Sequence, residues 1–440
     1  MERKRNLAAT HGLWVPTVWM LIVGSRSVGR WIDVNQNDYT GGSPLDQLVV
    51  TILMVLSITI IHRRKLDWPR IIRDNSWLIL LFAYMGLSII WSEFPFISLK
   101  RWIKVFGGLL MALVVLSEPR PLEALESVLR RSAYVLVPLS LLLVRYFPVY
   151  GRTYGRWDGS EMWTGVATHK NGLGQLCAIS AIFLFWALMR EWTLGSQLKR
   201  NRLAFSDLLV LAITVYLLKG PSNGAYSATS VSITILGVVL LVFLQWKIGA
   251  RFVMARPKAL VVTLVLTYLL FSDMLTETIA TILNRDKNLT GRATDIWPVV
   301  LEAASHHPIF GAGYAGVWGV GAEISSKVEV EQAHNGYLDV FLQLGMVGIG
   351  LLTAFLLAFC DRMKRAFRHV LPWGSYAATV LAGSLIYNNS ETSFLEYTSY
   401  LWTIMILMTV VFSASSFRVL KRGSADVKEI PEPSRPRYPR

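Results

Sequence analysis

The chain has 440 residues, of which 53% are hydrophobic and only 17% are charged. A soluble protein of this length seldom has such a balance, so the composition argues against a soluble globular enzyme and favours a protein surrounded by hydrocarbon. The net charge of +15 leaves two explanations open, an anionic partner such as nucleic acid or a membrane topology with basic loops on one side.

Apolar segments follow one another along most of the chain. Read with a window of roughly 19 residues, the sequence divides into about twelve such segments, most of them long enough to cross a bilayer as a helix. Runs such as 226–246 lack the two-residue alternation of a transmembrane barrel strand. We therefore predict an all-α, polytopic membrane protein with spans near 12–28, 46–62, 76–91, 98–117, 132–147, 171–189, 206–219, 226–246, 258–272, 335–360, 370–387 and 398–414.

Basic residues gather in alternate loops between these spans. With both termini assigned to the cytoplasm, roughly 30 of the 44 Lys and Arg fall on the inner side, in stretches such as 62–65, 199–202 and 361–365. This positive-inside pattern accounts for the basicity, so we expect no nucleic-acid partner. The basic N-terminus leads into an apolar stretch without a convincing cleavage site, which predicts a retained first span.

The predicted spans divide the chain into four parts. Residues 1–272 hold roughly nine spans, 273–333 form a large hydrophilic loop on the outer side, 334–416 hold the remaining spans, and 417–440 form a Pro- and Arg-rich tail that we expect to be disordered. Within the loop we expect a helix over 291–305, capped by Thr290 and kinked at Pro298. Long outer loops are where function should be sought.

Several cations lie on the predicted outer side, against the topological bias. A membrane-anchored anion such as a lipid-linked diphosphate would need cations at the outer ends of the helices, and arginine is the better clamp. The alternative is that these side chains only reach to lipid headgroups, as is common at the ends of spans. The candidate substrate-binding residues are Arg101, Lys104, Arg152, Arg156, Lys170, Asn171 and Lys219, with Asn335 beside the histidine considered next. Arg292, in the longest outer loop, is a catalytic candidate.

His334 lies at the water-facing mouth of a predicted span. A neutral imidazole can accept a proton from a hydroxyl near pH 7, which suits general-base catalysis, although a lone histidine is more often structural. Asp339 is a poor candidate to orient it, because five residues of helix place the two side chains well apart around the axis. Glu331, or a residue elsewhere in the bundle, is the more plausible partner.

The sequence carries no pattern typical of metal or nucleotide chemistry. His306 and His307 are adjacent, which is not the spacing that places two ligands on one helix face. There is no Gly-x-x-x-x-Gly-Lys loop and no Gly-x-Ser-x-Gly turn. We expect no metal and no cofactor.

Three groups of motifs resemble the O-antigen ligase and polymerase superfamily. His334-Asn335, nine further residues and then Gly345-Met-Val-Gly348 is similar to its His-Asn-x9-Gly-x-x-Gly signature. Gly291-Arg292 with the later Pro308-Ile-Phe-Gly-Ala-Gly run resembles its large outer loop, and the Ser-x-x-Pro-x-x-Ser-Leu-x-Arg run ending at Arg101 resembles an earlier motif. The stretch Thr-His-Lys-Asn-Gly-Leu-Gly over 168–174 is similar to the branch of exopolysaccharide production proteins.

The resemblance implies a GT-C-like enzyme of the bacterial inner membrane that acts on the periplasmic side. It implies metal-independent, inverting transfer of a glycan from undecaprenyl diphosphate to an acceptor glycan or to lipid A-core, with His334 as the base and Arg292 on the diphosphate. Polysaccharide export or chain-length proteins would be partners. Where the family often has Ser-Arg-Gly-Ala, this chain has Asn223 in place of the arginine, so another cation such as Lys219, Arg152 or Arg156 would have to replace its charge.

Two other functions remain open. A transporter or flippase for lipid-linked glycans also fits a polytopic helical protein, but transporters usually place their unusual polar residues near the middle of the membrane, whereas here they lie at span mouths and in loops. A scaffold protein without catalysis would tolerate changes at His334. Polymerase and ligase differ only in the acceptor, so the sequence does not separate them, and the 168–174 stretch alone favours exopolysaccharide polymerisation.

Overall fold

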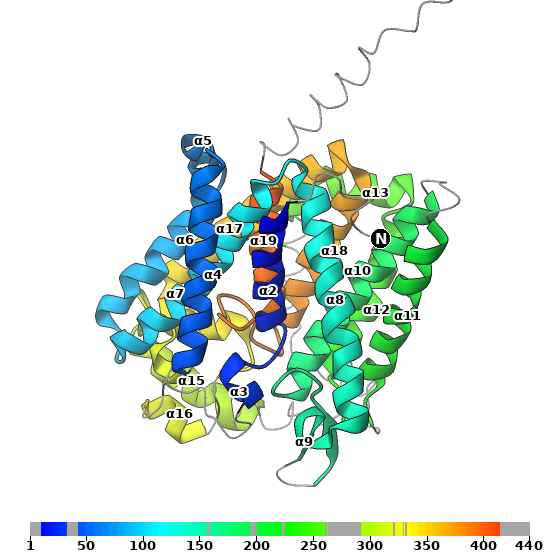
Figure 1. Cartoon of the computed structure of the whole chain (residues 1–440). Helices are drawn as coiled ribbons and strands as arrows, with labels where there is room; N and C mark the ends of the chain where they lie inside the picture. The colour runs from blue at the N-terminus through cyan, green and yellow to red at the C-terminus, as the bar shows by residue number, and fades with distance from the viewer. Residues whose placement is uncertain are drawn as a thin grey trace, which may run out of the picture.

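A computed structural model describes residues 10–32, 43–155, 159–193, 200–221, 225–259, 262, 292–319, 322–328, 330 and 332–413. In this part of the chain the protein is a bundle of helices (Figure 1), in agreement with the predicted all-α class. The first half contains η1 (His11–Leu13), α2 (Trp14–Val23), α3 (Val28–Ile32), α4 (Pro44–Arg63), α5 (Trp68–Asp74), α6 (Ser76–Leu87), η2 (Ser88–Trp91), α7 (Pro95–Leu116), α8 (Pro121–Tyr146), α9 (Pro148–Gly151), α10 (Lys170–Thr193) and α11 (Arg200–Lys219).

The second half contains α12 (Ala228–Phe243), α13 (Lys247–Ala255), η3 (Arg292–Ile296), α15 (Trp297–Ser305), η4 (Gly316–Trp318), α16 (Glu323–Val328), α17 (Gly336–His369), α18 (Leu371–Tyr387) and α19 (Tyr400–Val411). A small antiparallel hairpin of β1 (Arg152–Tyr154) and β2 (Glu161–Trp163) interrupts the helices, with Thr153 opposite Met162. Its threonine, tyrosine and tryptophan favour extended backbone, so this segment is a correction to the purely helical prediction.

Helices lie at the predicted spans that fall within the described residues. By length and composition four of the described helices can cross a membrane, namely α4, α8, α10 and α17, or up to five if the bent pair of α5 with α6 and η2 forms one span. Three shorter apolar helices accompany them, at His11–Val23, Ala228–Phe243 and Tyr400–Val411. The protein is thus a multi-pass helical membrane protein, while the number twelve stays a prediction. Most of the predicted span 258–272 and the tail 417–440 lie outside the described residues.

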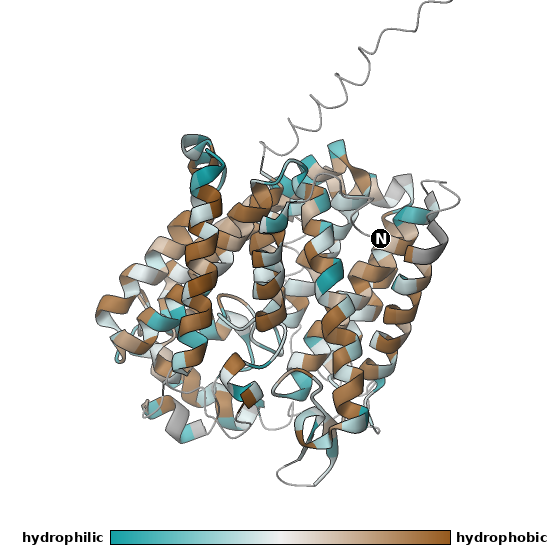
Figure 2. Ribbon diagram, in the orientation of Figure 1, coloured by the Kyte–Doolittle hydropathy of each residue, from teal (hydrophilic) through white to brown (hydrophobic). Residues whose placement is uncertain are grey.

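Hydrophobic residues make up most of the length of the helices, and hydrophilic residues are frequent toward the helix ends (Figure 2). Exposed apolar residues along α4 and α11, such as Ile52, Val55, Leu208 and Val215, are those expected of a surface that faces lipid rather than water. Serine and threonine hydroxyls inside these helices donate to the carbonyl four residues earlier, as Ser57 does to Leu53. These hydroxyls are therefore hydrogen-bonded within their own helices, without water.

The elements that we predict to be outside lie together at one end of the bundle. Figure 1 shows α9, α15 and α16 at the lower end and α5 and α13 at the upper end. The first set belongs to the predicted outer segments and the second to the predicted basic inner loops. The hydrophilic segments that carry the candidate residues thus meet at the same face.

Helix α17 is broken near its first third, and a loop fills the break. Gly345 has φ 62° inside the helix, in the left-handed region that favours glycine. The N–H groups of Met346 and Val347 donate to the carbonyls of Pro308 and Ile309, at 2.9 and 3.1 Å. A Cβ on Gly345 would come within 2.3 Å of the Ile309 carbonyl oxygen. Glycine at 345 is therefore required for this docking, and the freed backbone groups are paired by protein.

Candidate active site

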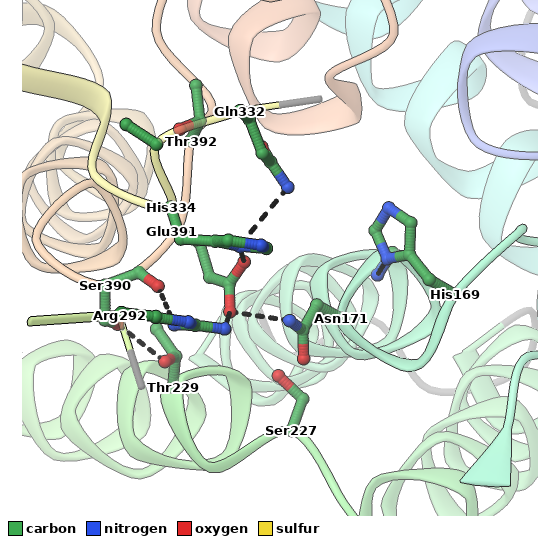
Figure 3. Close-up of polar contacts among 12 residues, drawn as sticks. His169, Asn171, Ser227, Thr229, Arg292, Gln332, His334, Ser390, Glu391 and Thr392 are labelled. Carbon is green, nitrogen blue, oxygen red and sulfur yellow. Dashed lines mark hydrogen bonds and ion pairs between the residues drawn. The ribbon is translucent and has the colours of Figure 1, made fainter. Parts of the chain in front are cut away.

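Four segments that are far apart in the sequence meet at one point. They are the first turn of α10 with Asn171, the turn η3 with Arg292, the residues 332–335 before α17 with His334, and the loop 388–399 between α18 and α19 with Glu391. Figure 3 shows the first three side chains pointing toward Glu391 from separate elements. The bundle thus gathers two basic groups and an amide around one carboxylate.

Glu391 is the centre of this cluster and is only 3% exposed. Its Oε1 accepts from Asn171 Nδ2 at 2.6 Å and from Arg292 Nη2 at 2.8 Å. Its Oε2 lies 3.1 Å from His334 Nδ1. A buried carboxylate is stable only when it is paired and hydrogen-bonded, and here both oxygens have partners.

The loop that carries Glu391 is shaped by a buried asparagine. Asn388 Oδ1 accepts the backbone N–H groups of Ser393 and Phe394, each at 2.9 Å, while its Nδ2 donates to the carbonyl of Ser384 at 2.7 Å. The Asn388 carbonyl accepts the N–H of Gly336 at 2.8 Å. A Cβ on Gly336 would lie 2.0 Å from Asn388 Oδ1, so only glycine lets the start of α17 approach this loop.

The position of His334 is fixed by its own backbone conformation and by the helix cap that follows it. Its φ of 51° is left-handed, which is uncommon for a residue other than glycine. On the C-terminal side Asn335 caps α17, and its side-chain oxygen accepts from the N–H groups of Tyr337 and Leu338, each at 3.1 Å. The predicted binding residue Asn335 thus occupies a helix cap, and this contact presents the imidazole next to it.

Asp339 anchors the chain before His334 and does not orient the imidazole. It accepts from the N–H of Ala333 at 3.1 Å and from Trp318 Nε1 at 2.8 Å, and the Thr392 hydroxyl donates to it as well. This network joins the outer loop, the start of α17 and the loop of Glu391.

The charges around Glu391 set its protonation. Burial by itself raises the pKa of this carboxyl, but the guanidinium of Arg292 and the hydrogen bond and charge of His334 outweigh burial and lower the pKa to about 2. Glu391 is therefore ionised at neutral pH and can only accept hydrogen bonds. The proton of the neutral His334 ring then lies on Nδ1, which leaves the lone pair on Nε2 to act as a base.

Arg292 lies in a short π-helical turn, where the backbone is wider than in an α-helix. Its Nη1 donates to the carbonyl of Ser390 and its Nη2 pairs with Glu391. The side chain is 17% exposed, against 4% for Glu391. A single helix was predicted over 291–305, but the structure has this turn followed by α15, with Pro298 in the first turn of α15. The predicted cap Thr290 lies outside the described residues.

The match to known proteins covers three of the four residues of this site, Asn171, Arg292 and His334. Residues 162–353 match the family model described as O-antigen ligase. This region is similar to the O-antigen ligase family. The chain is also similar to the exopolysaccharide production protein ExoQ of Rhizobium meliloti (strain 1021), with 25% identity over 306 residues, which are 66% of this chain. The chain covers 65% of that relative, slightly under two thirds of its length. The family resemblance inferred from the motifs is confirmed.

The O-antigen ligase region runs from β2 into α17, so it contains Asn171, Arg292 and His334 but ends before Glu391. The structure explains both halves of the His-Asn-x9-Gly-x-x-Gly signature. His334 faces the carboxylate, and Gly345 opens the break in which the Pro308–Gly313 run docks, where Gly313 N donates to the carbonyl of Gln343 at 2.9 Å.

Two other predicted cations, Arg101 and Lys104, contact the outer loop and the ring of Tyr397. Arg101 is 4% exposed and donates to the carbonyls of Ala315 and Trp318, at 2.7 and 3.2 Å, so in this structure it supports the glycine-rich segment. Lys104 lies over the ring of Tyr397 with its Nζ 5.1 Å from the centroid.

The remaining candidates are placed as follows. Arg152 pairs with Glu161 across the hairpin at 3.1 Å, which ties its charge to a carboxylate. Lys170 is the first residue of α10, next to Asn171, and Lys219 is the exposed last residue of α11. Arg156 and Asn223 lie outside the described residues, as does Glu331, the suggested partner of His334.

Glu391 is the residue that the sequence analysis missed. A signal for it exists, because 388–393 is a run of six polar residues, Asn-Asn-Ser-Glu-Thr-Ser, between two apolar spans on the predicted outer side. Such a run, with a carboxylate in it, is unusual where a short turn would suffice. In the part of the chain that the structure describes, no three His, Cys, Asp or Glu side chains are grouped as metal ligands would be.

Proposed function

We propose that this protein transfers a glycan from an undecaprenyl diphosphate donor to a hydroxyl of an acceptor glycan, on the outer side of the bacterial inner membrane. The observation that carries this proposal is the cluster of Arg292, His334 and Asn171 around the buried Glu391. It combines a cation for a diphosphate with an imidazole oriented as a base. The family match and the exopolysaccharide production protein among the relatives support glycan assembly as the process.

Arg292 would bind the diphosphate of the donor. Its bonds to Ser390 and Glu391 use only part of the N–H donors of a guanidinium, and 17% of the side chain is exposed. The pairing with Glu391 fixes the orientation of the guanidinium before substrate arrives. A preorganised cation can stabilise the negative charge that develops on a departing diphosphate, and losing one such donor typically costs about 10² to 10³ in rate.

His334 would accept the proton of the acceptor hydroxyl. The acceptor oxygen attacks the anomeric carbon, the bond from that carbon to the diphosphate oxygen breaks, and the electron pair leaves with the diphosphate. The proton moves to His334 Nε2, and Glu391 stabilises the resulting imidazolium through Nδ1. Direct displacement inverts the sugar configuration and needs no metal. General-base help of this kind contributes about 10² to 10⁴ in rate.

The membrane arrangement that goes with this mechanism is a GT-C-like fold of about twelve spans with both termini in the cytoplasm. The common position of α9, α15 and α16 at one end of the bundle supports it, since these elements belong to the segments predicted outside. The hydrophilic face with Glu391 would then meet the periplasmic headgroup region, where a polyprenyl diphosphate is anchored.

We propose further that the acceptor is a growing exopolysaccharide and that the activity is polymerisation rather than ligation to lipid A-core. The 168–174 stretch and the similarity to ExoQ support this choice. Proteins that export the polymer or set its length would be partners. The deciding experiment is analysis of lipid-linked glycans after deletion of the gene. Accumulated single repeat units are expected, whereas accumulated long chains would mean a ligase, and an unchanged pool would contradict both.

A further inference from the structure

A second histidine lies beside the cluster and has no role in the mechanism so far. His169 directly precedes α10, two residues before Asn171. Figure 3 shows its imidazole on the opposite side of Asn171 from Arg292. It lies close enough to Glu391 and His334 for their charges to act on its ring. The residue is exposed, so a substrate at the cluster can reach it.

The Nδ1 atoms of the two histidines have opposite hydrogen-bonding roles, because Nδ1 accepts in His169 and donates in His334. The backbone N–H of Gly172 donates to His169 Nδ1 at 2.9 Å. That bond requires an unprotonated Nδ1, so the neutral His169 ring carries its proton on Nε2 and offers a donor there. His334 instead turns Nδ1 to an ionised carboxylate and keeps the lone pair on Nε2. One imidazole is thus set as an acceptor of protons and the other as a hydrogen-bond donor.

The first turn of α10 holds the donor in place. With Gly172 bonded to it, His169 acts as the side-chain cap of a 24-residue helix. A Cβ on Gly172 would come within 3.2 Å of His169 Cε1, so glycine at 172 leaves room for the ring beside the helix start. The same turn carries Asn171 to Glu391 at 2.6 Å. The cap and the cluster are therefore parts of one rigid turn.

We propose that His169 Nε2–H donates a hydrogen bond to the diphosphate of the lipid-linked donor and stabilises it as the bond to the sugar breaks. This inference rests on the proposed function. His169 keeps its proton throughout: the acceptor proton goes to His334, and the electron pair of the broken bond leaves with the diphosphate. His169 and Arg292 would then contact the diphosphate from the two sides of Asn171.

Two substitutions separate this role from that of a helix cap. The side-chain oxygen of His169→Asn can take the place of Nδ1, and asparagine is a good capping residue, but the variant has no donor at the position of Nε2. His169→Gln places an amide N–H near the position of Nε2 and gives up the cap. We expect His169→Asn to be as stable as wild type and to transfer glycan about 10²-fold more slowly, mainly in kcat. His169→Gln should recover part of the rate.

The assay measures initial rates of glycan transfer in membranes that contain the full chain, together with inhibition by undecaprenyl diphosphate, the product. Inhibition should weaken in His169→Asn, which a purely structural role would not cause. The matched control is His306→Asn, an exposed histidine in the same outer region. Full transfer and unchanged inhibition in His169→Asn would overturn this inference alone. Absence of transfer by the wild type would overturn the proposed function and this inference with it.

Discussion

The carboxylate of Glu391 gives the sharpest test of the site, through the substitution Glu391→Gln. The amide has the same shape but no charge, so Arg292 and His334 lose the anion between them while the packing stays the same. We expect glycan transfer to fall, because the imidazolium that forms at His334 would no longer be stabilised and the tautomer of the neutral ring would no longer be fixed.

The size of the effect follows from the structure. Arg292 and His334 hold the pKa of the buried Glu391 at about 2, against an ordinary value of 4.5, although burial alone raises it. The difference corresponds to about 3 kcal/mol in favour of the ionised form. A loss of that size in the transition state slows a reaction about 10²-fold. An effect up to about 10⁴ is within the range known when the carboxylate behind a catalytic histidine becomes an amide.

The assay compares initial rates of transfer at equal amounts of protein in membranes. Glu302→Gln is the matched control, since Glu302 is an exposed carboxylate on α15 in the same outer region. Both variants should insert at wild-type abundance. Transfer by Glu391→Gln within threefold of wild type, a limit well short of the 10²-fold loss expected for this charge, would refute the reasoning that the carboxylate acts through His334.

Four further predictions follow from the same geometry. His334→Ala should lower transfer about 10² to 10⁴-fold with unchanged membrane abundance, and normal polymer in cells that carry it would contradict the role of base. The pKa of Glu391 is lower in the folded protein than in the unfolded chain, so its ionised form contributes to the free energy of unfolding above pH 4.5. This contribution, about 3 kcal/mol, should be lost as the pH falls toward 2. Thermal unfolding over this pH range should show a smaller loss of stability in Glu391→Gln than in wild type. Gly345→Ala should lower both stability and glycan transfer, because the added Cβ would clash with the Ile309 carbonyl and alanine disfavours the left-handed backbone at this position. Gly350→Ala is the control and should change neither, because a Cβ there would have no atom within 4 Å. Purified protein should transfer glycan in EDTA without ATP, and a strict requirement for either would point to another mechanism.

The positions of the helices could be read from the sequence because hydrophobicity is local. The predicted spans 46–62 and 98–117 correspond to α4 and α7 within a few residues. The predicted span 335–360 lies within α17, apart from its first residue, and this helix continues to His369. Charged residues such as Arg362 and Lys364 are compatible with a helix, so the helix can continue where the apolar run ends. The break at Gly345 was missed, because it depends on the docking of a distant loop.

The candidate site was predictable in part. His334, Arg292 and Asn171 were singled out from their position at span mouths and from the family resemblance, and the structure brings them together. Arg101 was singled out on the same grounds, yet it bonds to backbone carbonyls of the outer loop. The sequence around a basic residue at the end of a span does not indicate whether its side chain binds a substrate or a backbone carbonyl.

The sequence by itself determined that this is a helical membrane protein, where most of its helices lie, and that an imidazole and a guanidinium stand in its longest outer segment. These properties depend on hydrophobic length, on local charge and on short motifs. Only the tertiary structure decided that Glu391 joins them and that His169 lies beside the same cluster. Those relations connect residues up to 220 positions apart, and such contacts are set by how helices pack and which backbone groups a loop must satisfy, neither of which has a local signal in the chain.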